Sequence, residues 1–468
     1  MNLPNIKEAR KRENKKTEFI YLNEEYDKNA FKGQKYFIRT YGCQMNVHDS
    51  EEISAHLENI GFVKTEDMDD ADIVILNTCA IRENAHDKLY GFLGRCKHVK
   101  TSINPNLIIA ICGCMAQEEN VVNTIMEKHP YVDLVFGTHN ICDLEKLLIN
   151  KTDKQNIEVI SCEGNVYENV KYKRDSKFKA WVNIQYGCDK FCTYCIVPYT
   201  RGKQRSRKSD DILKEVEELV KDGYLEVTLL GQNVNAYGKD IEGELSFAEL
   251  LQKVADTGIK RLRFVTSHPW DFTDEMIDVI AKNDNIMNYI HLPLQSGSDR
   301  ILKLMGRRYT KEEYITLFDK IKNKINNVSI TTDIIVGFPN ETEEDYNETL
   351  DVVNHCEYDS AFTFIYSPRE GTPAAKMEDS IKLEEKECRL YKLNELINNY
   401  SLKNNKKYVG NTYDVLVEGI NDKDSSKVFG YTETMKLVNF VGGEELIGKI
   451  VPVKIIDAKS FSLDGEMK

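Results

Sequence analysis

The chain contains the stretch AWVNIQYGCDKFCTYC at residues 180–195, in which an apolar run leads directly into three cysteines. These are Cys188, Cys192 and Cys195, in the spacing C-x3-C-x2-C. A structural zinc site usually takes four protein ligands and an ordinary electron-transfer iron–sulfur cluster takes four thiolates, so three thiolates leave one position open. The alternative is a zinc knuckle with a distant fourth ligand, although no partner C-x2-C follows. The stretch therefore predicts a strand that ends at an open metal centre.

Aromatic residues precede the second and third of these cysteines, Phe191 before Cys192 and Tyr194 before Cys195. With this spacing the segment resembles the signature of the radical S-adenosylmethionine (SAM) enzymes. The resemblance implies an iron–sulfur cluster whose open iron binds the amino and carboxylate groups of SAM.

The composition limits the class of protein. The chain has 468 residues, 12 cysteines and a net charge of -13. This length predicts about three domains. Residues 1–16 are charged and no window approaches the roughly 18 apolar residues of a membrane span, so we expect a cytoplasmic protein with no membrane partner. In a reducing cytosol, clustered cysteines indicate metal more often than disulfides. With this net charge, a nucleic acid would have to bind at local basic patches.

The N-terminal part repeats one pattern three times: an apolar strand, a cysteine and a helical stretch. The predicted strands cover residues 36–40, 72–76 and 107–111. Strands and helices that alternate at this length predict parallel βαβ units with buried strands. Ligand sites in such open sheets lie beyond the carboxyl ends of the strands. The cysteines at these ends are Cys43, Cys79 and Cys114.

These three residues predict a second thiolate site. Their separations are 79 - 43 = 36 and 114 - 79 = 35 residues, about one βαβ step, so the fold would have to bring them together. Cys112 competes with Cys114, because both would point to the same face of a strand. We prefer Cys114 because a glycine precedes it at the strand exit, as Gly42 precedes Cys43. The alternative is three buried packing residues, since cysteine is often buried.

Strand–helix alternation resumes after Cys195 and continues to about residue 405. The six predicted strands cover residues 180–184, 227–230, 262–266, 289–294, 329–336 and 361–366. Six βα units without enough chain for eight predict a partial (β/α)6 barrel, with its active site at the carboxyl ends of the strands.

Amide and hydroxyl side chains gather after these strands and suit a polar nucleoside cofactor. We select four of them as cofactor-binding candidates: Gln232, Asn233, Gln295 and Ser296. His268 and His291 lie in or near the same segments. Nothing in the sequence places a base or nucleophile beside either histidine, so we assign no catalytic side chain.

From about residue 406 the pattern changes to short β-like runs at residues 413–417, 429–432, 437–440 and 450–456. Such strands predict a small β-barrel of a type that often binds single-stranded nucleic acid. Its aromatic residues, where exposed, are candidates for stacking on a base: Tyr408, Tyr413, Phe429, Tyr431 and Phe440.

Seven segments together resemble the tRNA methylthiotransferases of the MiaB type. They are GCQMN at 42–46, NTCAIRE at 77–83, GTHN at 137–140, GCDKFCTYCIVPYTRG at 187–202, LGQNV at 230–234, LPLQSGS at 292–298 and SPREGTP at 367–373. The resemblance covers residues 33–468. It implies a methylthiotransferase domain at 33–150, a linker at 151–173, a radical SAM domain at 174–405 and an RNA-binding, OB-like TRAM domain at 406–468. Residues 1–32 depart from the family pattern, and we expect a mobile tail in which residues 21–31 could be docked.

The resemblance also implies the chemistry. Cys188, Cys192 and Cys195 would hold a 4Fe-4S cluster that binds and cleaves SAM, and Cys43, Cys79 and Cys114 would hold an auxiliary, sulfur-delivering 4Fe-4S cluster. The family reaction adds a methylthio group to carbon 2 of N6-isopentenyladenosine next to the anticodon of tRNA. The expected partners are this tRNA, an electron donor such as flavodoxin or ferredoxin, and a sulfur donor. An aromatic C–H offers no acidic proton and no leaving group, which explains the need for radical chemistry.

Basic residues flank the cysteine loop. Before it lie Lys171, Lys173, Arg174, Lys177 and Lys179, and after it lie Arg201, Lys203, Arg205, Arg207 and Lys208. A charge run is usually a solvated face. Its position beside the predicted site favours contact with RNA phosphates.

Alternative functions share some of these features. Sister methylthiotransferases that act on threonylcarbamoyladenosine or on a ribosomal-protein aspartate have both cysteine triads, although Ile81-Arg82-Glu83 after Cys79 resembles the isopentenyl branch. A non-catalytic iron–sulfur carrier or sensor would not cleave SAM. A passive RNA-binding protein with structural zinc would contain no iron.

Overall fold

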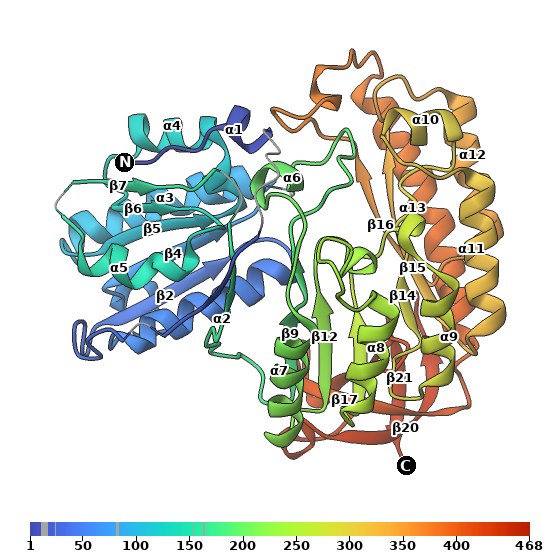
Figure 1. Ribbon diagram of the computed structural model, residues 1–468. Helices are drawn as coiled ribbons and strands as arrows, with labels where there is room; N and C mark the ends of the chain where they lie inside the picture. Colours follow the sequence, from blue (N-terminus) through green and yellow to red (C-terminus); the bar gives the residue numbers. More distant parts are fainter. Residues whose placement is uncertain (11–16, 24, 81–83, 153, 162–163) are drawn as a thin grey trace. The chain divides into compact units, whose positions relative to one another are not determined.

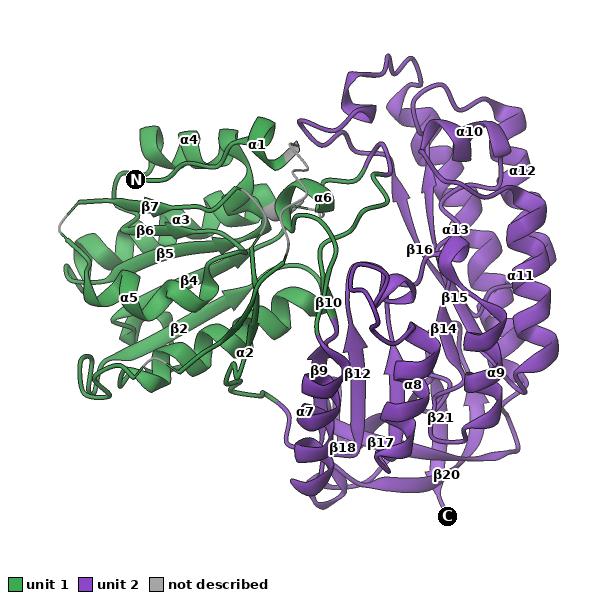
Figure 2. Ribbon diagram, viewed as in Figure 1, with its two compact units in different colours: residues 1–175, 185–191, 195–207 green, residues 176–184, 192–194, 208–468 purple. Residues whose placement is uncertain are grey.

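Figure 1 shows a computed structural model of the 468-residue chain, which describes residues 1–10, 17–23, 25–80, 84–152, 154–161 and 164–468. The chain forms two compact units (Figure 2). The first comprises residues 1–175, 185–191 and 195–207, and the second comprises residues 176–184, 192–194 and 208–468. The cysteine loop thus contributes residues to both units.

The first unit contains a parallel sheet with the strand order β3-β2-β4-β5-β6-β7. Its strands are β2 (Lys35–Thr40), β3 (Val63–Lys64), β4 (Ile73–Thr78), β5 (Ile108–Gly113), β6 (Leu134–Phe136) and β7 (Asn156–Glu158). The prediction of a parallel α/β sheet built on β2, β4 and β5 is confirmed. The sequence analysis missed β3, β6 and β7, because strands of two or three residues are too short to show a periodic pattern.

Helices cover both faces of this sheet. They are α2 (Gln44–Asn59), α3 (Asn84–Ser102), α4 (Glu119–Lys128) and α5 (Leu144–Ile149). Val74 and Ile109 pack with residues of α3 and α4. Their neighbours Ile75 and Ala110 pack with α2 and α5 on the other face. The two faces follow from the alternation of side chains along a strand.

The described parts of residues 1–32 contact other parts of the first unit, and these contacts extend beyond residues 21–31, the part that could be docked. Asn2 forms an isolated parallel β-bridge with Glu158, and helix α1 (Ile6–Arg10) follows Asn2 in the chain. Strand β1 (Phe19–Tyr21) pairs in parallel with β8 (Val166–Glu168). Phe31 stacks on Phe62 with ring centroids 4.7 Å apart. The polar composition of residues 1–32 did not predict these contacts, because strands can pair through backbone hydrogen bonds without an apolar pattern.

Three further short elements complete the first unit. They are α6 (Val197–Thr200) and the antiparallel pair β10 (Gln185–Tyr186) and β11 (Arg205–Ser206). Strand β10 precedes the cysteine loop in sequence and strand β11 follows it. Their pairing therefore brings the two ends of the loop together.

The second unit contains six parallel strands: β9 (Lys179–Asn183), β12 (Glu226–Leu230), β13 (Arg261–Phe264), β14 (Tyr289–His291), β15 (Ser329–Val336) and β16 (Ser360–Ile365). They form the sheets β9-β12-β13 and β14-β15-β16, which a bridge between Leu262 and Ile286 connects. Spatial order therefore follows sequence order, as the predicted partial barrel requires. Strand β14 is shorter than expected, because Pro293 cannot donate a backbone hydrogen bond and Gln295 has a positive φ of 68°.

Helices pack against these strands around one large core. They are α7 (Ser209–Lys221), α8 (Phe247–Asp256), α9 (Asp274–Lys282), α10 (Asp299–Leu304), α11 (Lys311–Lys324), α12 (Glu343–Cys356) and α13 (Leu383–Lys406) (Figure 1). Capping boxes fix the starts of α8, α11 and α12, at Ser246, Thr310 and Thr342. In each capping box, side-chain oxygens accept hydrogen bonds from two backbone N–H groups that have no partner within the helix.

The C-terminal residues form a closed barrel with the strand order β17-β18-β19-β21-β20. Its strands are β17 (Thr412–Asn421), β18 (Asp424–Thr432), β19 (Leu437–Val441), β20 (Ile450–Ala458) and β21 (Leu463–Met467). The predicted small β-barrel is confirmed. Strand β21 was missed because its sequence, LDGEM, has little apolar alternation.

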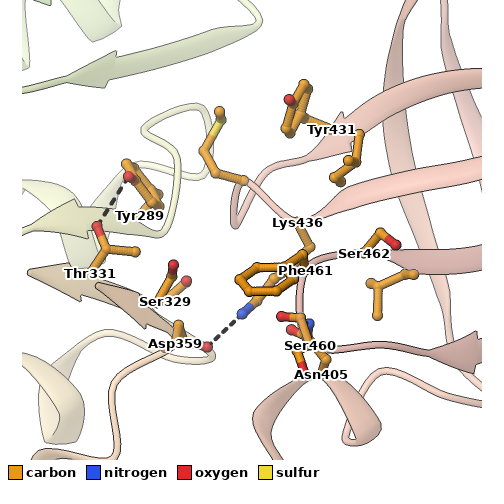
Figure 3. Close-up of a pocket in the computed structure, with 14 residues that line it drawn as sticks. Tyr289, Ser329, Thr331, Asp359, Asn405, Tyr431, Lys436, Ser460, Phe461 and Ser462 are labelled. Carbon is orange, nitrogen blue, oxygen red and sulfur yellow. Dashed lines mark hydrogen bonds and ion pairs between the residues drawn. The ribbon is translucent and has the colours of Figure 1, made fainter. Parts of the chain in front are cut away.

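The barrel is joined firmly to the rest of the second unit. The Lys436 ammonium pairs with Asp359 Oδ1 at 2.8 Å, and both residues are buried. Arg261 donates to the carbonyl oxygens of Tyr431 at 2.8 Å and Asp414 at 2.7 Å. A cavity of about 210 Å³ lies beside the ion pair, with Phe461 on the barrel side (Figure 3). Tyr289 and Ser329 line it at the amino ends of β14 and β15, so it is separate from the predicted cofactor loops.

Among the described residues, no helix combines the length and the apolar character that crossing a bilayer requires.

Candidate functional site

Cys43, Cys79 and Cys114 follow three neighbouring strands of the first unit. Cys43 is the N-cap of α2, shortly after β2 ends. Cys79 directly follows β4, and Cys114 directly follows β5 and begins the 3-10 helix η2 (Cys114–Gln117). Because β2, β4 and β5 are adjacent and parallel, their carboxyl ends lie side by side. The sheet therefore brings together cysteines that are far apart in sequence.

The Asn46 side chain lies at the centre of this group. Its Oδ1 atom is 4.0 Å from both Cys43 Sγ and Cys114 Sγ. Its Nδ2 atom donates to the carbonyl oxygens of Tyr41 at 2.7 Å and Thr78 at 2.8 Å, so it connects two strand exits. A methyl group at Gly42 would lie 2.8 Å from Cys79 Sγ. Glycine is therefore needed here for Cys79 to approach the segment that carries Cys43.

Arg201 supplies a buried positive charge to the same group. Its Nη2 atom donates to Asn46 Oδ1 at 2.8 Å and pairs with Asp49 Oδ2 at 2.5 Å. Burial raises the pKa of the Cys114 thiol to about 11, although the Arg201 charge acts in the opposite direction. A thiol with a raised pKa is a poor nucleophile, whereas a bound metal deprotonates it directly. The group therefore fits a metal cluster better than covalent catalysis.

Cys112 faces away from Cys114. Cys112 packs with Ala110 and α2 on one face of the sheet, whereas Cys114 packs with Cys79 on the other. The expectation that both cysteines point to one face is wrong, because Gly113 between them has a φ of 87° and breaks the strand alternation. This difference supports the choice of Cys114 as the third ligand candidate.

The loop cysteines belong to both compact units, Cys188 and Cys195 to the first and Cys192 to the second. In the first unit, the Cys188 backbone N–H donates to the Gly202 carbonyl oxygen at 3.1 Å. In the second unit, Arg307 Nη1 lies 3.5 Å from Cys192 Sγ. The buried Arg307 side chain is held by the Tyr309 hydroxyl at 3.0 Å and the Pro293 carbonyl at 3.2 Å. A fixed positive charge therefore lies beside the Cys192 sulfur. No sequence motif connects residues 192 and 307, so sequence reasoning missed Arg307.

The four cofactor-binding candidates lie at the carboxyl ends of β12 and β14, and they differ in their surroundings. Asn233 donates to Asp271 Oδ2 at 2.7 Å, while its buried Oδ1 has no hydrogen-bond partner among the described residues. Ser296 is completely buried, and its Oγ accepts from the Ser298 N–H at 3.3 Å, so it stabilises its own loop. Gln295 is mostly buried and Gln232 is half-buried.

Ser267, just beyond β13, is a further candidate. Its buried Oγ also has no hydrogen-bond partner within the described part of the chain. Buried polar atoms are normally paired, so Asn233 Oδ1 and Ser267 Oγ indicate a polar ligand at adjacent strand ends. His268 and His291 both form hydrogen bonds, to the Trp270 N–H and to the Thr331 hydroxyl respectively. His291 Nε2 also pairs with Asp333 Oδ2 at 3.2 Å.

The prediction that the loop-flanking arginines contact RNA is wrong for three of them. Arg201, Arg205 and Arg207 are buried. Arg207 forms two bonds with Glu168, at 2.8 and 2.7 Å. The partners Asp49 and Glu168 lie far from the arginines in sequence, which is why the run looked like a basic surface. Lys171, Lys177 and Lys208 are exposed.

Comparison with known proteins identifies the family. A protein of Bacillus cytotoxicus named tRNA-2-methylthio-N(6)-dimethylallyladenosine synthase is 54% identical over 99% of this chain and 92% of its own. A protein of Bacillus subtilis with the same name is 53% identical, with the same coverage of each chain. The chain belongs to this synthase family.

Three family descriptions match successive parts of this synthase-family chain. They are "Uncharacterized protein family UPF0004" at residues 35–137, "Radical SAM superfamily" at 182–353 and "TRAM domain" at 406–468. A solved structure of the radical S-adenosylmethionine methyltransferase TsrM from Kitasatospora setae aligns with a TM-score of 0.53 and 15% identity, over 74% of this chain and 77% of that chain. This likeness concerns the fold alone. Ile81-Arg82-Glu83, which resemble the isopentenyl branch of the family, lie outside the described residues.

Proposed function

We propose that the protein adds a methylthio group to carbon 2 of N6-isopentenyladenosine next to the anticodon of tRNA. The observation that carries this function is the near-full-length identity of 53–54% to proteins named for this product, in a chain with both cysteine triads. The sister substrates, threonylcarbamoyladenosine and a protein aspartate, have no comparable support.

Two 4Fe-4S clusters and SAM fit the residues present. The thiols of Cys43 and Cys114 lie 4.0 Å from Asn46 Oδ1, and Cys79 lies against Gly42. These three cysteines would hold the auxiliary cluster. Cys188, Cys192 and Cys195 would hold the SAM-binding cluster. When bound, these groups supply the electron, the radical and the sulfur that amino-acid side chains cannot supply.

The surrounding side chains would bind and orient these groups. Arg201 holds Asn46 and Asp49 in place beside the first triad. Arg307 places a positive charge next to Cys192. Asn233 Oδ1 and Ser267 Oγ would accept hydrogen bonds from SAM. Gln232 is next to Asn233 in sequence, and Gln295 is next to Ser296, which stabilises its own loop.

The barrel and exposed lysines would bind the tRNA. Phe461 is 74% exposed and is free to stack on a base, whereas Tyr408 and Phe440 are buried and cannot. Lys171, Lys177 and Lys208 are exposed and would contact phosphates. We further propose that the reaction takes place in the cytoplasm, with an electron donor such as flavodoxin or ferredoxin and a separate sulfur donor.

A defined substrate tests this function. The anaerobically reconstituted protein is incubated with SAM, a reductant and tRNA that carries isopentenyladenosine, and the nucleosides are analysed by mass spectrometry. We expect 2-methylthio-N6-isopentenyladenosine, which a Cys188→Ala control would not form. Methylthiolation of only threonylcarbamoyladenosine tRNA or of an aspartate would indicate a sister enzyme. Absence of SAM cleavage would indicate a non-catalytic protein.

A further inference from the structure

A second set of metal-ligand side chains lies in the first unit, apart from the two cysteine triads. Glu52 and His56 are on α2, four residues apart on one helix face, and Cys142 is in the 3-10 helix η3 (Ile141–Asp143). One ligand atom from each lies within 4.8 Å of the others. The Cys142 thiol donates to Glu52 Oε1 at 3.3 Å, and His56 Nε2 is 3.8 Å from the same oxygen. The function proposed above uses none of these residues.

The His56 ring is oriented as in a metal site. Its Nδ1 atom lies 3.3 Å from Glu145 Oε2, and the other oxygen of Glu145 accepts from Asn59 Nδ2 at 2.8 Å. His56 is 9% exposed, and its Nε2 has no hydrogen-bond partner among the described residues. Histidines that bind metals commonly give one ring N–H to a carboxylate and present the other nitrogen to the ion. His56 thus presents Nε2 toward Glu52 and Cys142.

The spacing of these atoms suits a tetrahedral ion. Zinc bonds of about 2.0 Å to nitrogen or oxygen and 2.3 Å to sulfur place neighbouring ligand atoms about 3.3 to 3.5 Å apart. The Cys142–Glu52 separation of 3.3 Å and the His56–Glu52 separation of 3.8 Å lie near these values, and all three ligand atoms lie within 4.8 Å of one another. Without an ion, the polar contact that the buried His56 Nε2 makes among the described residues is with Glu52 Oε1 at 3.8 Å, which is longer than a hydrogen bond.

We propose that Glu52, His56 and Cys142 bind a divalent zinc-type cation, with Glu145 orienting His56 and water in the fourth position. Carboxylate, imidazole and thiolate are all donors that zinc accepts. Cys142 Sγ and His56 Nε2 both bind the ion in their deprotonated forms, so any proton that either atom carries leaves to solvent. The ion would connect η3 to α2, the helix whose first turns carry Asn46 and Asp49. It would thereby hold the surroundings of the first cysteine triad in place.

Zinc binding by the iron-loaded protein tests this proposal, because loaded clusters occupy the other cysteine triads. After equilibrium dialysis against zinc, metal content is measured by mass spectrometry. We expect about one zinc per chain in the unsubstituted protein and in the exposed control Cys388→Ser. Cys142→Ser and His56→Gln should lose this zinc while keeping their iron. Glu145→Gln should weaken zinc binding about 10- to 100-fold.

Thermal unfolding provides a second readout. Zinc should raise the Tm of the unsubstituted protein and of Cys388→Ser, and it should leave the Tm of Cys142→Ser unchanged. Both Cys142→Ser and His56→Gln are close in size to the native residue, so the fold should be preserved. The proposal is overturned if the unsubstituted protein binds no zinc, or if both variants bind it as tightly as the unsubstituted protein.

Discussion

The two cysteine triads are built in different ways. Cys43, Cys79 and Cys114 come from the ends of three neighbouring strands and meet only because the sheet is folded. Cys188, Cys192 and Cys195 come from one short loop. A buried arginine nevertheless lies at each triad, Arg201 near the first and Arg307 beside Cys192. We call the first set the strand triad and the second the loop triad. The difference indicates that assembly of the strand triad depends on the fold of its unit, whereas assembly of the loop triad depends on the spacing of its cysteines in sequence.

The largest expected effect concerns the identity of the third strand cysteine. Cys114→Ala should abolish methylthio product, because the thiol that shares Asn46 with Cys43 is lost. Cys112→Ala should keep the activity, because Cys112 packs on the other face of the sheet. Product formation by nucleoside mass spectrometry and iron content distinguish the two variants. If Cys112→Ala lost the methylthio product and Cys114→Ala kept it, Cys112 would be the third ligand in place of Cys114.

The second prediction concerns the dependence of the strand triad on its fold. Arg201→Ala should destabilise the protein by about 3–5 kcal/mol, because Asp49 is left as an unpaired buried charge. Chemical denaturation measures this loss, with exposed Lys208→Ala as the control. If Arg201 bound RNA instead, its loss would reduce the salt dependence of tRNA binding with little effect on stability.

The third prediction concerns the loop triad. Arg307→Gln should slow SAM cleavage by about tenfold or more, because Cys192 loses a charged neighbour worth about 1.5–3 kcal/mol. The matched control is Arg308→Gln, since Arg308 is exposed and lies against the Trp270 ring at 4.8 Å. Release of 5'-deoxyadenosine gives the rate. Equal rates of 5'-deoxyadenosine release in the two variants would show that Arg307 does not contribute to SAM cleavage.

The smallest effect is expected in the barrel, outside both triads. Phe461→Ala should weaken tRNA binding by about 1–3 kcal/mol, the usual contribution of a ring that stacks on a base. SAM cleavage without tRNA should be unchanged. Exposed Leu383→Ala is the control. A point variant is preferable to removal of the barrel, because Asp359 and Arg261 would lose their barrel partners. Unchanged affinity would exclude stacking by Phe461.

Sequence reasoning succeeded where the signal was local or periodic. The continuous apolar runs of β4 and β5 predicted the sheet. The assignment of Cys188, Cys192 and Cys195 as cluster ligands stays a prediction. It failed where the deciding contact was distant in sequence. Arg201 looked like a surface charge because Asp49 is 152 residues away, and Arg307 went unnoticed because Cys192 is 115 residues away. Only the fold brings such pairs together.

The central claim is that the two triads do separate parts of one reaction. Cys79→Ala and Cys188→Ala should be purified and reconstituted anaerobically, and both 5'-deoxyadenosine and methylthio product should be measured in each. We predict that Cys79→Ala cleaves SAM without forming product and that Cys188→Ala does neither, with iron falling by about half in each variant. Full product formation by Cys79→Ala, or SAM cleavage by Cys188→Ala, would contradict the account.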